Sequence, residues 1–124
     1  RAQIEERSLA RFPQLAQRID QTSGTLSGGQ QQMLAMARGL ATDPALLVLD
    51  ELSMGLAPLI VEELYGVVAH IAADGVSIVV VEQFARTVLG VSDRAAIMVH
   101  GKIRAVGDPT AIEAELSSAY LGGQ

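Results

Sequence analysis

The 124-residue chain has no cysteine, and only 3% of its residues are aromatic. Without cysteine it can form neither a disulfide nor a thiolate metal site, which fits a reducing cytosol. The shortage of aromatic side chains disfavours a surface on which nucleobases stack. The net charge of −5 also provides no basic surface for a nucleic-acid backbone. We therefore expect no nucleic-acid partner.

Long apolar runs are missing as well. The longest, Ala45–Leu49 and Val76–Val81, have the length of strands and fall far short of the ~18 residues expected of a membrane span. No secretion signal is visible, and Arg1 is not an initiator methionine, so we expect the protein to begin upstream. Hydrophobic residues nevertheless make up 49% of the chain, which predicts a folded core of about one domain.

Helical and strand patterns alternate along the chain. The apolar strand, helix and strand in the middle predict a βαβ unit, whose parallel strands we expect to be covered on both faces. The expected elements begin with a helical stretch over residues 1–23, interrupted at Pro13, and a helix from Ser27 that is ended by Asp43-Pro44. The strand Ala45–Leu49, a helix from Pro58 stopped by Gly75 and the strand Val76–Val81 follow. The last elements are a short helix at Phe84–Val91, a hairpin of Ala95–Val99 and Lys102–Val106 that turns at His100-Gly101, and a helix begun by Asp108-Pro109.

The first chemical motif lies at the start of the second helix. Its residues are Leu26, Ser27, Gly28, Gly29 and Gln30. Ser27 and Gln30 have the spacing of a capping box. Glycines allow close approach to the backbone, and the unpaired amides of a helix start suit a phosphate. Taken alone, the same five residues are equally typical of a glycine-containing loop with an ordinary cap.

The second motif is a pair of carboxylates. Asp50 and Glu51 follow the first apolar strand, and ligands of open α/β sheets bind beyond the carboxyl ends of the strands. One carboxylate can hold Mg²⁺ through water while the other positions and deprotonates an attacking water. Acidic residues also often simply end strands, and this second reading stays open for the pair alone.

Together the motifs resemble those of the ABC ATPase family over essentially the whole chain. Leu26–Gln30 matches the family's signature motif, Leu46–Asp50 its Walker B strand and Glu51 its catalytic glutamate, and Ser53–Leu56 occupies the place of its D-loop. The resemblance implies an α/β fold, namely the carboxyl-terminal half of a P-loop NTPase-like ABC ATPase. Residues 1–45 would form a partial helical region bearing the signature, and residues 46–124 would form part of the catalytic core.

A narrower resemblance is to the ATPase subunits of branched-chain amino-acid importers. It rests on Glu51–Pro58, on Val81-Glu82-Gln83 and on the ending Ala119–Gly123. Urea-type importers have similar ATPases, so that substrate remains an alternative.

The sequence departs from the family at three places. Leu52 replaces the usual proline after the catalytic glutamate, and we expect a looser turn there. Gln83 stands where most members have a switch histidine, and it can bond a γ-phosphate without taking a proton. No G-x-x-x-x-G-K-[ST] loop occurs in the chain, so we expect the Walker A half upstream of Arg1.

The resemblance implies a head-to-tail dimer with a second ATPase subunit, using ATP and Mg²⁺. Leu26–Gln30 would contact the partner's ATP, while Asp50 (metal), Glu51 and Gln83 (catalytic) would serve the ATP of their own subunit. The further partners implied are transmembrane permease subunits and, indirectly, a solute-binding protein outside the membrane. The implied location is peripheral, on the cytoplasmic face of the plasma membrane.

Two other interpretations stay open. The chain could be a truncated, inactive remnant or an interaction module of such an ATPase. It could also come from a non-transport ABC ATPase, although its acidic and compact sequence lacks the basic surfaces and insertions typical of those proteins.

Overall fold

The computed structural model describes residues 2–121 and divides the chain into two compact units at the Glu82–Gln83 bond. The first unit carries Leu26–Gln30, Asp50 and Glu51. Gln83 is the first residue of the second unit. The boundary expected between residues 45 and 46 falls inside the first unit, because the helix before it and the helix after it pack against each other.

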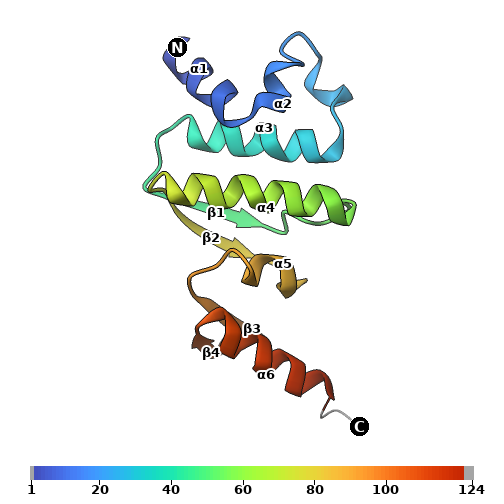
Figure 1. Cartoon of the computed structure of the whole chain (residues 1–124), viewed down its shortest axis with the longest axis vertical. Coiled ribbons are helices and arrows are strands. Elements are labelled where there is room, and N and C mark those ends of the chain that lie inside the picture. Colours follow the sequence, from blue (N-terminus) through green and yellow to red (C-terminus); the bar gives the residue numbers. More distant parts are fainter. Residues whose placement is uncertain (1, 122–124) are drawn as a thin grey trace. The chain divides into compact units, whose positions relative to one another are not determined.

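The first unit opens with helices (Figure 1). These are α1 (Ala2–Arg11), α2 (Pro13–Ala16), the 3₁₀ turn η1 (Ser23–Thr25) and α3 (Gly28–Leu40). The predicted interruption at Pro13 is confirmed: Phe12 leaves the helical conformation, as a residue before proline tends to, and Pro13 starts α2. The Phe12 ring is buried, so the break also fixes a core side chain.

The predicted βαβ unit follows and is confirmed. It consists of β1 (Leu46–Asp50), α4 (Pro58–Ala73) and β2 (Ser77–Val81), with the two strands parallel and in register from Leu46 opposite Ser77 to Asp50 opposite Val81. Gly75 follows α4 with a φ of 98°, a left-handed conformation that suits glycine. Because the register is parallel, Asp50 and Val81 end their strands at the same edge.

Only one face of this two-stranded sheet is covered by the described residues. Leu49 is buried on the covered face, and a Cβ added to Gly39 of α3 would lie 3.1 Å from Leu47 Cδ1. The opposite face is apolar and exposed, with exposed fractions of 53% at Leu46, 60% at Val48, 47% at Val79 and 52% at Val81. The expectation of two covered faces is therefore wrong for this chain, because α3 and α4 supply cover on one side alone.

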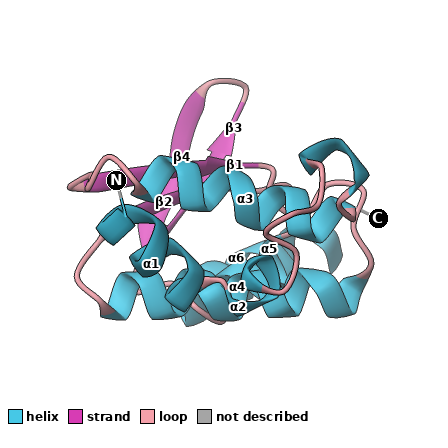
Figure 2. Cartoon of the chain, turned by 90° about the horizontal axis from the view of Figure 1, so that it is seen from above, coloured by secondary structure: helices cyan, strands magenta, loops and turns pink. Residues whose placement is uncertain are grey.

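The second unit contains α5 (Ala85–Leu89), β3 (Ala95–Val99), β4 (Lys102–Gly107) and α6 (Pro109–Leu121); Figure 2 marks helices in cyan and strands in magenta. The predicted hairpin is confirmed, with positive φ at both turn residues, His100 and Gly101. The expected ending motif Ala119–Gly123 lies partly outside the described residues. Among residues 2–121, no helix is both long enough and apolar enough to cross a bilayer.

Candidate nucleotide site

The start of α3 has the predicted capping box. Ser27 Oγ accepts a hydrogen bond from the Gln30 amide at 3.3 Å, and Gln30 Oε1 accepts one from the Ser27 amide at 3.1 Å. The pair fixes where the helix begins and satisfies two backbone donors reciprocally. Ser27 is exposed, and because its oxygen already accepts, its hydroxyl proton is available to another acceptor.

The next amides of α3 are the ones that could contact an anion. A helix leaves its first amides without intrahelical partners. The Gln31 amide returns to Ser27 O at 2.8 Å, whereas the amides of Gly28 and Gly29 have no hydrogen-bond partner among the described residues. Together with the Ser27 hydroxyl, they form a small donor set at the positive end of the helix dipole.

The two glycines also allow close packing inside the chain. A Cβ on Gly28 would lie 2.8 Å from Leu56 Cδ2, and one on Gly29 would lie 2.5 Å from Ile60 Cγ2. Gly29 is buried. The sequence suggested that glycine lets a ligand approach the helix start. The structure adds a second reason, which is that α3 begins directly against the chain segment entering α4.

Leu26 lies just before this helix and has a different environment. Its side chain is buried, and its carbonyl accepts a hydrogen bond from Gln31 Nε2 at 3.2 Å. Leu26 thus anchors the loop before Ser27. Its side chain is not displayed to an external ligand.

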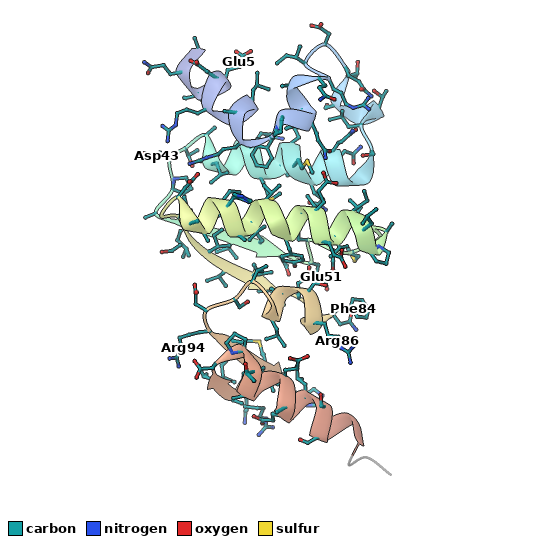
Figure 3. All side chains as sticks on the ribbon, in the orientation of Figure 1. Glu5, Asp43, Glu51, Phe84, Arg86 and Arg94 are labelled. Carbon is teal, nitrogen blue, oxygen red and sulfur yellow. The ribbon has the colours of Figure 1, made fainter. Side chains whose placement is uncertain are left out.

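Asp50 and Glu51 lie at the carboxyl end of β1, and both are exposed. Figure 3 labels Glu51. Asp50 is the last residue of the strand, while Glu51 has a φ of 48°, in the left-handed region. That conformation costs a residue with a side chain about 1–2 kcal/mol. The Glu51 amide donates to Val81 O at 2.9 Å, so a β-type bond to β2 helps to hold the glutamate in this unfavourable conformation.

The turn after Glu51 is anchored on both sides. Leu52, which stands where the family has proline, is only 3% exposed and packs into the core. The Met54 amide donates to Glu51 O at 3.2 Å, and Gly55 has a φ of 74°. Burial of Leu52 restrains the loop, and the looser turn that we expect from the loss of proline stays a prediction.

A hydrogen-bonded cluster centred on Glu82 ties this turn to the end of β2. Glu82 Oε1 accepts from the Ser53 amide at 2.9 Å and from the Tyr65 hydroxyl at 2.6 Å, and Oε2 accepts from Ser53 Oγ at 2.8 Å. Burial raises the pKa of Tyr65 well above its ordinary value, and the hydrogen bond to Glu82 and the charge of Glu82 raise it further. Tyr65 therefore stays protonated and donates.

Sequence reasoning missed this cluster. In the sequence, Glu82 stands out only as part of Val81-Glu82-Gln83, and no pattern marks Tyr65. A signal was present, since an acidic residue directly after an apolar strand is placed beside whatever follows the neighbouring parallel strand. The tyrosine could not be assigned from sequence, because its distance from Glu82 depends on how α4 lies over the sheet.

Gln83, the other expected catalytic residue, is exposed. It begins the second unit and directly follows Glu82 in the chain.

Among the other expected site residues, the structure brings Asp50 and Glu51 to one sheet edge. It also brings Gly28 and Gly29 against Leu56 and Ile60.

The exposed carboxylates at the carboxyl end of β1 fit magnesium that is bound together with a phosphate. Mg²⁺ is usually held by one or two carboxylates, with waters and phosphate oxygens completing its octahedron. An exposed Asp50 can supply such a carboxylate. In the described part of the chain, no three histidine, aspartate or glutamate side chains converge into a metal site.

A pocket of about 170 Å³ lies elsewhere in the first unit. It is lined by α1 and by the end of α3, with Arg7 and Asp43 paired across it at 3.6 Å. None of the expected site residues lines it.

Known proteins share much of this sequence and fold. The pattern that defines the ABC transporter family matches residues 2–53. The chain is 40% identical over 120 residues to the high-affinity branched-chain amino acid transport ATP-binding protein BraG of Pseudomonas aeruginosa. The chain belongs to the ABC transporter ATP-binding family. The match to BraG covers 95% of the chain and 52% of BraG, so this family member spans about half of that relative's length.

Solved structures confirm the predicted fold class. The ATP-binding cassette MJ1267 of an ABC transporter superimposes with a TM-score of 0.82 at 30% identity, covering 90% of this chain and 46% of that one. CbiO1 of Clostridium perfringens, part of the ABC transporter complex cbiONQ, gives 0.86 at 26% identity, covering 93% and 46%. The chain therefore has the fold of about half of an ABC ATPase cassette.

Proposed function

We propose that the intact protein containing this chain is an ATP-hydrolysing subunit of an ABC transporter and powers uptake of branched-chain amino acids. The observation that carries this proposal is the exposed Asp50-Glu51 pair, held on an anchored turn at the carboxyl end of β1. The similarity to BraG supports the choice of solute.

Each residue has a distinct role in this proposal. Glu51 orients the attacking water and accepts its proton, a general-base role that typically contributes about 10²–10⁴-fold in rate. Asp50 holds Mg²⁺, which when bound neutralises charge on the transferring phosphoryl group. Gln83 donates a hydrogen bond to the terminal phosphate. Ser27 and the Gly28 and Gly29 amides bind the ATP of the second subunit, as the donor set at the start of α3 allows.

The proposed partners follow from the same roles. A second ATPase subunit completes each nucleotide site head to tail, and transmembrane permease subunits receive the motion that ATP binding and hydrolysis produce. A solute-binding protein outside the membrane delivers the cargo. We place the subunit peripherally, at the cytoplasmic face of the membrane.

Copurification and transport test this function directly. The intact protein, affinity-tagged in its native host, should copurify with a membrane permease and hydrolyse ATP. In vesicles containing the assembled complex, leucine with the solute-binding protein should stimulate hydrolysis and uptake, whereas urea should not. Stimulation by urea alone would assign the complex to urea import, and copurification with no permease would reject a role in transport.

We further propose that residues 1–124 do not hydrolyse ATP by themselves. They contain no G-x-x-x-x-G-K-[ST] loop to hold a nucleotide beside Asp50 and Glu51. Equilibrium binding of ATP to the isolated chain, compared with the intact protein, tests this point. Tight binding and turnover by the isolated chain would show that another segment holds the phosphates.

A further inference from the structure

Among the described residues, two segments that lie far from Glu82 in sequence give its carboxylate three hydrogen bonds. Two come from Ser53, through its amide and its hydroxyl, and one comes from the Tyr65 hydroxyl of α4. Ser53 is two residues after Glu51, in the turn between β1 and α4. Glu82 thus connects the end of β2, the turn that follows β1, and the helix covering both strands.

This connection acts on a turn with an unfavourable backbone. Glu51 adopts a positive φ of 48°, and its side chain is exposed, so burial of that side chain does not hold this conformation. The restraints on the turn are the Glu51 amide bond to Val81, the burial of Leu52 and the two bonds from Ser53 to Glu82. Of these, the Glu82 bonds are side-chain hydrogen bonds, which a conservative substitution can alter without changing the buried Leu52.

We propose that Glu82 is a positioning residue for hydrolysis, whose carboxylate holds the Glu51–Gly55 turn so that Glu51 keeps the orientation needed to activate water. The inference deepens the proposed function and rests on it. Glu82 acts through the turn and touches no reacting group. Tyr65, which is 2% exposed, fixes the carboxylate from the core side.

The chemistry of the cluster predicts a graded response to substitution. Glutamine keeps the shape of the side chain, and its oxygen can still accept from the Ser53 amide and from Tyr65. Its NH₂ group would face Ser53 Oγ, which can accept as well as donate. Alanine removes every bond at once. Glu82→Gln should therefore retain most of the positioning, whereas Glu82→Ala should lose it.

The test compares these variants in the intact ATPase. We expect Glu82→Ala to lower kcat by about 10²-fold, the scale of a displaced reacting group, with the KM for ATP little changed, because Glu82 holds the turn and not the nucleotide. Glu82→Gln should recover most of the activity, and Ser53→Ala and Tyr65→Phe should each lower kcat partly. Glu62→Ala, which removes an exposed carboxylate of α4, is the matched control and should match wild type.

Amide hydrogen exchange gives a readout that is independent of catalysis. In Glu82→Ala the Ser53 amide should exchange faster, while the Leu64–Val68 amides of α4 keep their protection. Loss of kcat together with this local change supports the inference. A wild-type kcat in Glu82→Ala would overturn it. A second refuting result would be amide protection lost throughout α4 in Glu82→Ala while Ser53→Ala and Tyr65→Phe remain fully active.

The two proposals fail in different ways. If the wild-type protein hydrolyses no ATP, the proposed function fails, and unchanged Ser53 exchange in Glu82→Ala would then overturn the positioning role as well. If wild type is active and Glu82→Ala is equally active, only the positioning role fails.

Discussion

Replacing Gly29 with alanine should destabilise the protein, because the start of α3 lies against Ile60. The new Cβ would sit 2.5 Å from Ile60 Cγ2, whereas carbon atoms in contact normally lie about 3.5–4.0 Å apart. Ile60 cannot turn away easily, since a β-branched side chain in a helix is largely restricted to one χ1 rotamer. One of the two helices must therefore shift.

The expected cost follows from two opposing effects. An extra methyl group in a well-packed site typically costs about 1–3 kcal/mol. Alanine gains up to about 1 kcal/mol over glycine in a helix interior, and less in the first turn, where Gly29 lies. We expect Gly29→Ala to lower the free energy of unfolding by about 1–2 kcal/mol.

Chemical denaturation of the intact protein measures this change, and a double-mutant cycle identifies its cause. Ile60→Ala removes Cγ2, so the cost of Gly29→Ala should disappear in that background, giving a coupling of about 1 kcal/mol or more. Gly66→Ala is the control: Gly66 is exposed in the middle of α4 with nothing within 4 Å of an added Cβ, so it should stabilise by about 0.5–1 kcal/mol. A Gly29→Ala protein as stable as wild type, or an unchanged cost beside Ile60→Ala, would refute the packing argument.

Three further predictions concern other parts of the first unit. Ser27→Arg should abolish ATP-dependent dimerisation by crowding the phosphate at the start of α3; unimpaired dimerisation in size-exclusion chromatography would reject that role. Residues 1–124 alone should self-associate through the exposed sheet face, and Val48→Lys should weaken this association; a monomer at every concentration in light scattering would contradict the prediction. The pKa of Tyr65 is raised in the folded state above its ordinary 10.0. The contribution of Tyr65 to the free energy of unfolding should therefore be fully present below pH 10.0 and fall as the pH rises beyond it, because the unfolded chain releases the proton first. Tyr65→Phe should remove this part of the pH dependence of unfolding, and an identical alkaline profile would show that Tyr65 is not its source.

Local patterns in the sequence predicted much of the fold. The capping box of Ser27 and Gln30, the break at Pro13 and the turn at His100-Gly101 each depend on neighbouring residues, and all three appear as expected. Leu52 shows the limit of such reasoning. Its place after Glu51, where the family has proline, does not reveal that its side chain is buried, because burial depends on tertiary packing.

The candidate site was predictable where chain order alone places residues. Parallel strands with one connecting helix bring their carboxyl ends to one edge, so Asp50 and Glu51 could be assigned there. The contacts of Gly28 and Gly29 with Leu56 and Ile60 could not, because they depend on the approach of α3 to α4. The uncovered face of β1 and β2 also lay beyond prediction, since an apolar strand alone does not reveal what covers it.

Hydrolysis by a Glu51→Gln variant of the intact protein tests the central claim most directly. The substitution keeps the size of the side chain and removes its ability to act as a base, so steady-state ATPase activity should fall by at least about 10²-fold. ATP binding should remain, because Glu51 contributes to the reaction and not to holding the nucleotide. A variant that binds ATP and hydrolyses it at near wild-type rate would contradict the assignment of Glu51 as the base.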